Sequence, residues 1–161
     1  KVLIDGQPIH RPMARDQRVA YIAENPSQMM LFQDMSYLRN LTFCLPRQID
    51  SWFRRRSIYR SLRRELTPEL GAVFDKDIRD LNTQEKYALI FRRGLLQQPR
   101  VVFFEQPFWG NDVLLQQHIE RQVQLLLAKK IAVVVLIVGI YDAFPLAERT
   151  LIYKNGHLLT Q

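Results

Sequence analysis

The residues most able to do chemistry follow a run of apolar β-formers in the stretch VVFFEQPFWGND, residues 101–112. The run predicts a buried strand, and it ends in Glu105, Gln106 and Pro107. Two acids at such a strand end could hold a magnesium ion and polarise an attacking water. Here the second position carries an amide, which has no basic form at neutral pH. The frame of a reactive strand end is present, whereas the group that would act as its general base is absent.

The composition limits the class of protein. The chain has 161 residues, of which 47% are hydrophobic and 11% aromatic, which is enough for the core of one globular domain. Its single cysteine, Cys44, excludes an internal disulfide, and three scattered histidines offer no metal-ligand spacing. These features fit a reducing compartment. The longest apolar run, residues 131–140, is about half the length that a bilayer span requires and is interpreted as a buried strand.

Much of the net charge of +7 is concentrated in residues 51–70. This segment predicts a helix in which Trp52, Tyr59, Leu62 and Leu66 form an approximate apolar stripe. Three interpretations stay open: a solvated helix face, a surface for anionic lipid or an acidic partner, and a nucleic-acid surface. The solvated face is the default, and nucleic acid is the least favoured partner. The charged residues of the helix are Arg54, Arg55, Arg56, Arg60, Arg63 and Arg64.

The strand signals predict a mostly parallel sheet. The two strongest runs, 101–104 and 132–138, are apolar throughout rather than alternating, which is typical of parallel strands covered on both faces. The dipeptide Asn155–Gly156 predicts a hairpin turn near the C-terminus. The expected strands are 2–5, 19–22, 101–104, 132–138, 149–154 and 157–160.

Helical patterns fill the centre of the chain, so the sequence predicts an α/β layer with a helical block inserted in it. One helix start combines a cap at Thr67 with Pro68 at the first helical position. Another pairs Asn82 with Glu85 three residues later, which is the pattern of a capping box. The expected helices begin after Ser36, Thr67, Asn82 and Asp112.

Three segments carry a family resemblance when they are taken in order. Residues 18–43, RVAYIAENPSQMMLFQDMSYLRNLTF, resemble a Q-loop and the start of a helical subdomain. Residues 81–112, LNTQEKYALIFRRGLLQQPRVVFFEQPFWGND, resemble a signature helix, a magnesium strand and a D-loop. Residues 148–161, ERTLIYKNGHLLTQ, resemble a closing hairpin. Together, in order and spacing, they resemble the nucleotide-binding domain of an ABC transporter.

The resemblance implies an α/β fold of the P-loop NTPase, ABC type. Its parts are a core with a mostly parallel sheet, an inserted helical subdomain and a C-terminal β-hairpin. Residues 101–104 and 133–138 are then expected to be adjacent central strands. The implied domain is 1–161, N-terminally incomplete, with 33–80 as the helical subdomain and 1–32 and 81–161 as the core lobe.

The resemblance places altered residues at the reactive positions of the strand ends. Glu24 falls at the Q-loop glutamine and Glu105 at the magnesium-binding aspartate, so both are expected to be weak magnesium positions. Gln106 falls at the catalytic glutamate, and Gly139 falls at the switch histidine. Neither Gln106 nor Gly139 can do the chemistry that the family needs there. Hydrolysis at this half of the site is therefore expected to be slow.

The signature positions that the resemblance implies are altered as well. Asn82 falls at the signature serine, and Thr83 and Gln84 fall at its two glycines. Side chains at these positions hold the helix start away from a γ-phosphate, and Glu85 adds a like charge. Asp112 of the D-loop is retained. Binding of ATP and Mg²⁺ is therefore expected to be weak or lost.

The phosphate loop, G-x-x-x-x-G-K-[ST], does not occur in the 161 residues, and we expect it upstream of Lys1. The leading hypothesis is a catalytically degenerate ATP-binding subunit at the cytoplasmic face of a membrane. It would pair with a second nucleotide-binding domain and receive a transmembrane permease near residues 29–32, MMLF, which are equally plausible as core.

Three alternatives stay open. The chain is a functional ABC ATPase if Glu105 or Glu24 serves as a surrogate base. It is a soluble ABC-type protein of translation or chromosome upkeep if the arginine-rich helix binds nucleic acid. It is an unrelated α/β domain if residues 105–107 are an ordinary exit from a strand.

Overall fold

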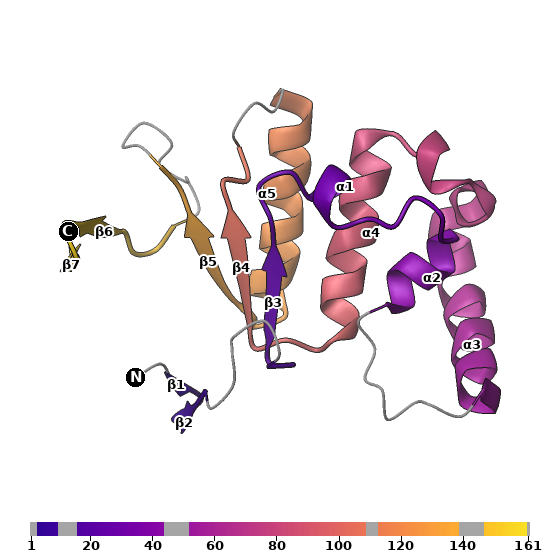
Figure 1. Cartoon of the computed structure of the whole chain (residues 1–161), viewed down its shortest axis with the longest axis horizontal. Coiled ribbons are helices and arrows are strands. Elements are labelled where there is room, and N and C mark those ends of the chain that lie inside the picture. Colours follow the sequence, from indigo (N-terminus) through magenta and orange to yellow (C-terminus); the bar gives the residue numbers. More distant parts are fainter. Residues whose placement is uncertain (1–2, 10–15, 44–51, 109–112, 139–146, 161) are drawn as a thin grey trace.

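The structure is a computed structural model that describes residues 3–9, 16–43, 52–108, 113–138 and 147–160 (Figure 1). Its elements are a small parallel sheet, a set of helices packed against it, and two separate hairpins. Within the described ranges, no helix is both long and apolar enough to cross a membrane.

Three parallel strands form the sheet, in the order β3-β4-β5. They are β3 (Val19–Ile22), β4 (Val101–Glu105) and β5 (Ala132–Leu136). The predicted positions of these strands are confirmed, although β5 is shorter than expected. The middle strand is the most deeply buried, and its residues Val102 and Phe104 are almost fully enclosed.

One face of the sheet packs against the helices α4 (Thr83–Leu96) and α5 (Val113–Ala128) (Figure 1). On this face the ring of Phe104 in β4 lies against the ring of Phe91 in α4, with centroids 5.0 Å apart. The apolar residues of both helices recur with the spacing of an amphipathic helix, so each helix buries one apolar stripe. The most enclosed helix residues are Leu89, Ile90, Phe91, Ile119, Val123 and Leu126.

The opposite face of the sheet is open in the described part of the chain. Tyr21, Val134 and Leu136 are exposed on it, and among the described strands β5 pairs only with β4. The expectations that both faces are covered and that residues 133–138 form a central strand are therefore wrong for the residues described. The expected adjacency of β4 and β5 is confirmed by a register that pairs Phe103 with Val134.

Helical elements occupy the chain between β3 and α4, as the sequence predicts. Figure 1 shows α2 and α3 on the side of α4 that faces away from the sheet. The buried apolar cluster continues from the sheet through α4 to these helices. The subdomain boundaries 33–80 remain a prediction. The elements are α1 (Pro26–Met29), α2 (Tyr37–Thr42), α3 (Trp52–Leu70), and the 3-10 helices η3 (Gly71–Asp75) and η4 (Ile78–Asp80).

The helix start predicted at Thr67 and Pro68 is wrong, because α3 runs through both residues without a break. The Thr67 hydroxyl donates a hydrogen bond back to the carbonyl of Arg63 instead of capping a new helix. Proline removes one backbone donor and crowds the preceding turn. Since α3 ends at Leu70, Pro68 lies in its last turn. Few backbone hydrogen bonds of the helix lie beyond this position, so the proline disturbs little of it.

The basic helix α3 is amphipathic, as its sequence predicts. Tyr59, Leu62 and Leu66 are half-buried, and the Tyr59 hydroxyl lies 3.3 Å from Thr42 Oγ1 of α2. The arginines whose side chains are described lie on the exposed face of the helix. They are Arg56, Arg60, Arg63 and Arg64.

Two hairpins lie apart from the parallel sheet (Figure 1). The predicted hairpin at Asn155–Gly156 is confirmed, and both of its turn residues have positive φ, of 49° and 83°. A second tight turn of the same kind, Asp5–Gly6, joins two very short strands near the start of the chain. The hairpin strands are β1 (Leu3–Ile4), β2 (Gln7–Pro8), β6 (Leu151–Lys154) and β7 (His157–Thr160).

Candidate functional site

The carboxyl ends of β3 and β4 meet at one edge of the sheet, and Glu105 is the last residue of β4. Gln106 follows in the left-handed region, with φ of 45°, and its amide donates to the carbonyl of Leu136 at 2.8 Å. A non-glycine residue in this conformation is uncommon, and a hydrogen bond from its amide helps to hold it. The chain therefore turns sharply at the position where the sequence offers an amide in place of a carboxylate.

Tyr21 provides a contact at this edge that the sequence did not reveal. Its hydroxyl donates a hydrogen bond to Oε2 of Glu105. This bond raises the pKa of Tyr21 to about 12, with smaller contributions from burial and from the charges of Glu105 and Glu24. Tyr21 is therefore a neutral donor at physiological pH, and the Glu105 carboxylate is its acceptor. The two strands pair in parallel register, which explains how residues 84 positions apart come together.

Magnesium fits the described residues of this edge poorly. Glu24 lies two residues beyond β3, close enough for its charge to raise the pKa of Tyr21. One carboxylate is thus engaged by a phenol, and a second lies nearby. Among the described residues, no cluster of three or more Asp, Glu, His or Cys side chains could hold a metal ion. Magnesium prefers near-octahedral oxygen coordination, which this pair alone does not provide.

The predicted capping box is present at the start of α4, where two side chains bond backbone amides of the same turn. Asn82 Oδ1 accepts from the amide of Glu85, and Glu85 Oε2 accepts from the amide of Asn82, both at 2.8 Å. Lys76 Nζ donates to the other Glu85 oxygen at 2.7 Å. This bond is the main reason that the pKa of Glu85 is lowered, and the bond from Asn82 adds to it. Thr83 and Gln84 are exposed in the first turn.

A helix start of this kind fits a phosphate group poorly. An anion at a helix N-terminus is held by free backbone amides, but here the Glu85 amide is already used. The Glu85 carboxylate also places negative charge where a phosphate would approach. Figure 1 shows that α4 begins at the end of the molecule where β3 and β4 end. The strand ends and the helix start therefore lie at the same end of the described structure.

The end of α1 and the segment that leads from it to α2 expose two apolar side chains. Met29 and Phe32 are 72% and 40% exposed, whereas Leu31 between them is buried. Ala23 and Met30 also touch, since the amide of Ala23 lies 3.3 Å from the Met30 sulfur. In the MMLF segment, Leu31 therefore belongs to the core, whereas Met29 and Phe32 lie at the surface.

Two buried polar side chains hold this segment, and the sequence analysis missed both. Asn40 is fully buried, and its side chain bonds both the amide and the carbonyl of Phe32, at 2.8 and 2.9 Å. Arg93 is 5% exposed, and its Nη1 donates to the carbonyl of Met30 at 2.6 Å. A polar residue on the apolar face of a predicted helix is the only sequence signal for either role.

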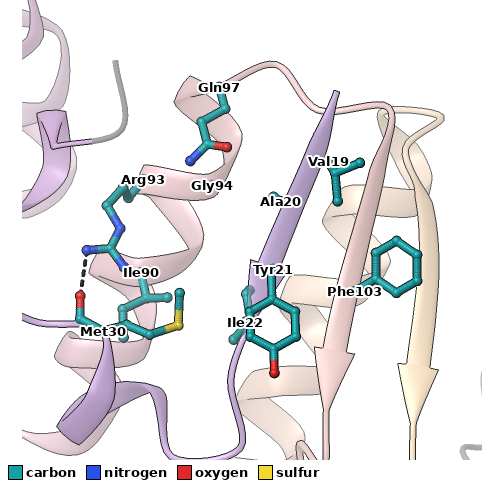
Figure 2. A pocket seen from close by; sticks show the side chains of 10 residues that line it. All are labelled: Val19, Ala20, Tyr21, Ile22, Met30, Ile90, Arg93, Gly94, Gln97 and Phe103. Atoms are coloured by element: carbon teal, nitrogen blue, oxygen red, sulfur yellow. Dashed lines mark hydrogen bonds between the residues drawn. The ribbon is translucent and has the colours of Figure 1, made fainter. Parts of the chain in front are cut away.

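Arg93 also lines a cavity of about 460 Å³ between β3 and α4 (Figure 2). Most of its wall is apolar, and Figure 2 shows the Arg93 side chain reaching the Met30 carbonyl at one side. Gly94 faces Ala20 here, and a Cβ added to the glycine would lie 3.8 Å from the Ala20 Cβ. None of the described predicted site residues lines the cavity, but Tyr21 lines it and donates a hydrogen bond to Glu105. Two predicted site residues, Asp112 and Gly139, lie outside the described residues.

Comparisons with known proteins give relatives of one kind. The chain is 28% identical to the molybdenum import ATP-binding protein ModC of Mycobacterium tuberculosis, over 97% of the chain and 42% of that protein. It is 27% identical to the lipopolysaccharide export system ATP-binding protein LptB of Acidithiobacillus ferridurans, over 88% of the chain and 57% of that protein. No family model matches the chain.

The fold has a solved counterpart. CbiO1 of Clostridium perfringens, described as part of the ABC transporter complex cbiONQ, superposes with a TM-score of 0.68 at 18% identity. The match covers 98% of this chain and 63% of CbiO1. The predicted fold class is therefore confirmed. The chain spans 32% to 57% of the lengths of the curated relatives that it matches.

Proposed function

We propose a function from the premise that the chain is an ABC-type nucleotide-binding domain, which its sequence relatives and its fold both support. The proposed role is that of an ATP-binding subunit of a membrane transporter in which this cassette contributes little hydrolysis. It pairs with a second cassette that carries intact motifs, and the pair acts on a transmembrane permease at the cytoplasmic face of the membrane.

The observation that carries this proposal is the joint alteration of two places that lie at the same end of the described structure. At the strand end, Gln106 occupies the proposed position of the catalytic base, and an amide cannot accept the proton of an attacking water. At the start of α4, Asn82 and Glu85 close the helix terminus that would otherwise receive a phosphate.

The two alterations affect different nucleotides in a head-to-tail pair of cassettes. In the proposed pair, the strand end of this chain serves its own nucleotide, whereas its signature position at 82–85 faces the nucleotide of the partner. The partner's site then lacks only the signature contribution and stays active at a reduced rate. The site at Gln106 lacks a base and serves at most to hold nucleotide.

The segment that presents Met29 and Phe32 is the proposed contact with the permease. These side chains are exposed, and Phe32 is reinforced by Phe43, whose ring centroid lies 4.4 Å away. The hydrogen bonds from Asn40 and Arg93 fix the backbone beneath them. A rigid apolar surface loses little conformational entropy on docking and so suits a coupling contact.

The structure offers less support for the alternative functions. A surrogate base at Glu105 would have its Oε2 already engaged by the hydrogen bond from Tyr21. A nucleic-acid role has only the exposed arginines of α3 in its favour. If that role were correct, binding to RNA or DNA would weaken steeply as salt is raised, because phosphate contacts release counterions.

The subunit composition of the native complex tests the pairing. The full-length protein is purified from its own cells with an affinity tag, and the copy number of each cassette is measured by native mass spectrometry. One copy of this chain, one copy of a second cassette and a permease are expected. Two copies of this chain without a second cassette would contradict the heterodimer.

A further inference from the structure

The helix α3 carries a row of arginines along one side. Its members occupy positions i, i+4, i+7 and i+8, which share one face of a helix, and all of them are exposed. Glu65 comes nine residues after the first arginine, which is about two and a half turns, so this acid lies on the opposite side of the helix. The exposed surface of α3 is therefore divided by charge. The arginine row consists of Arg56, Arg60, Arg63 and Arg64.

Two members of the arginine row differ from exposed arginines elsewhere in the chain. Arg79, which is also exposed, forms an ion pair with Asp34 at 3.2 Å. Within the described ranges, no ion pair joins Arg60 or Arg64 to an acid. Cations that the protein does not compensate create a positive potential outside the surface. The row is therefore complementary to an anionic surface.

We propose that the arginine row of α3 binds the anionic headgroups of a phospholipid membrane. The inference rests on the proposed function in one respect: a cassette that acts on a permease works beside the cytoplasmic leaflet, which carries anionic lipids. A guanidinium group suits a lipid phosphate, because its donors can form two parallel hydrogen bonds with the phosphate oxygens. The partner is thus a surface of negative charge rather than a single molecule.

The arginine row adjoins the segment proposed to contact the permease. Tyr59, one residue before Arg60, places its hydroxyl 3.3 Å from Oγ1 of Thr42 in α2. The residue after Thr42 is Phe43, whose ring packs against that of Phe32. The helix that bears the row is therefore tied to the element that ends at the proposed permease contact. A membrane contact here would help to orient the cassette beside its permease.

The side chains of α3 favour contact with lipid headgroups over insertion into a membrane and over nucleic acid. Tyr59, Leu62 and Leu66 are half-buried in the fold, so they are not available to enter the acyl chains. The other exposed residues within the row are serines, Ser57 and Ser61. Proteins that hold single-stranded nucleic acid stack its bases on aromatic side chains, which this face does not expose. The row extends over about 12 Å of the helix, a length that can lie along a flat surface.

Sedimentation with vesicles tests the proposal on the purified full-length protein, without permease, second cassette or nucleotide. Vesicles of phosphatidylcholine with about 30% phosphatidylglycerol are compared with vesicles of phosphatidylcholine alone. The protein should bind the anionic vesicles and not the neutral ones. Its binding should weaken as salt is raised, because screening reduces the attraction between exposed charges.

Two double variants assign the binding to the arginine row. Arg60→Gln/Arg64→Gln should weaken binding to the anionic vesicles about 30-fold, which is about 2 kcal/mol, from the usual contribution of an arginine near such a surface. Arg79→Gln/Arg100→Gln is the matched control, since it removes the same charge from two exposed arginines outside α3. Its binding should stay within about threefold of the wild type. All four positions are exposed, so both variants should fold normally, which circular dichroism checks.

Equal binding to neutral and anionic vesicles, or binding to neither, would overturn the inference. So would an equal loss in the two double variants, because the attraction would then belong to the net charge and not to the row. A single-stranded RNA could bind more tightly than the anionic vesicles at the same salt, with the same dependence on Arg60 and Arg64. That result would assign the row to nucleic acid and overturn the inference as well. These measurements contain no second cassette, so a failed heterodimer would leave their outcome unchanged.

Discussion

Asn40 of α2 holds Phe32 by both polar groups of its backbone: Oδ1 accepts from the Phe32 amide, and Nδ2 donates to the Phe32 carbonyl. The same Nδ2 also lies within 3.1 Å of the carbonyl of Met35. Asn40 has no exposed surface, so water cannot replace these bonds. One side chain therefore fixes the path of the segment proposed to contact the permease.

Replacing Asn40 by leucine should destabilise the fold by about 3 kcal/mol, because two backbone groups of Phe32 lose their partners inside the protein. Urea unfolding measures the change. Asn25→Leu is the matched control, because Asn25 is exposed and makes no side-chain capping bond at the start of α1. That variant should stay within about 0.5 kcal/mol of the wild type. Equal losses in both variants would show that leucine itself, not the lost bonds, is harmful.

Arg93→Met should also be destabilising, by about 2 kcal/mol, since it leaves the carbonyl of Met30 without the donor from Nη1. Methionine keeps most of the length of the side chain and its apolar packing. Arg100→Met removes a charge from an exposed side chain whose ion pair with Asp5 is 3.4 Å long. This control should cost less than about 1 kcal/mol. Thermal unfolding at fixed pH and salt compares the two, and a similar cost for both would contradict the role given to Arg93.

The capping box predicts a pH dependence that belongs to Glu85. The pKa of Glu85 is lowered from 4.5, first by the hydrogen bond from Lys76. A carboxyl group with a lowered folded-state pKa adds stability above its unfolded-state pKa and loses it as the pH falls through the folded-state pKa. The contribution of Glu85 should therefore begin to fall below about pH 4.5 and disappear once the pH is below the folded-state pKa. Glu85→Gln should flatten the dependence of unfolding free energy on pH in that range.

The control for the capping box is Glu65→Gln on the exposed face of α3. Its pH profile should follow that of the wild type. The pH profile of Glu85→Gln could also follow that of the wild type down to the lowest pH at which the protein folds. That result would mean that the bonds from Lys76 and Asn82 do not stabilise the Glu85 carboxylate.

Local signals in the sequence predicted the parts of the structure that depend on near neighbours. The capping box needs only residues three positions apart, Asn82 and Glu85, and it is present as predicted. The hairpin at Asn155–Gly156 is equally local. The helix start predicted at Thr67 was wrong, because a proline in the last turn of a helix gives the same sequence pattern as a proline in the first turn.

Contacts between distant segments were not predictable in this way. Arg93 and Met30 are 63 positions apart, and Tyr21 and Glu105 are 84 apart. A single sequence does not show which strand will lie beside which helix, so it cannot assign these partners. The open face of β5 was missed for a related reason: apolar strands indicate that a cover is needed, but not which segment supplies it.

The central claim is that this cassette supplies the weak half of a shared site. Steady-state phosphate release by the assembled full-length complex tests it directly in two variants. Gln106→Glu should change the rate little, because Gly139, at the proposed switch position, is left as it is. Thr83→Gly/Gln84→Gly should raise the rate, because it removes two side chains from the helix start that is proposed to face the partner's nucleotide, while the capping box of Asn82 and Glu85 stays in place.

Matched controls isolate the two positions in that measurement. Gln98→Glu makes the same change at another glutamine with positive φ, of 52°, although Gln98 is exposed and Gln106 is half-buried. Thr83→Ala/Gln84→Ala shortens the side chains without the added backbone freedom of glycine. The account predicts that only the glycine variant rises clearly above the wild type. A wild-type chain that alone releases phosphate at one per second or faster, and loses this activity in Gln106→Ala, would contradict it.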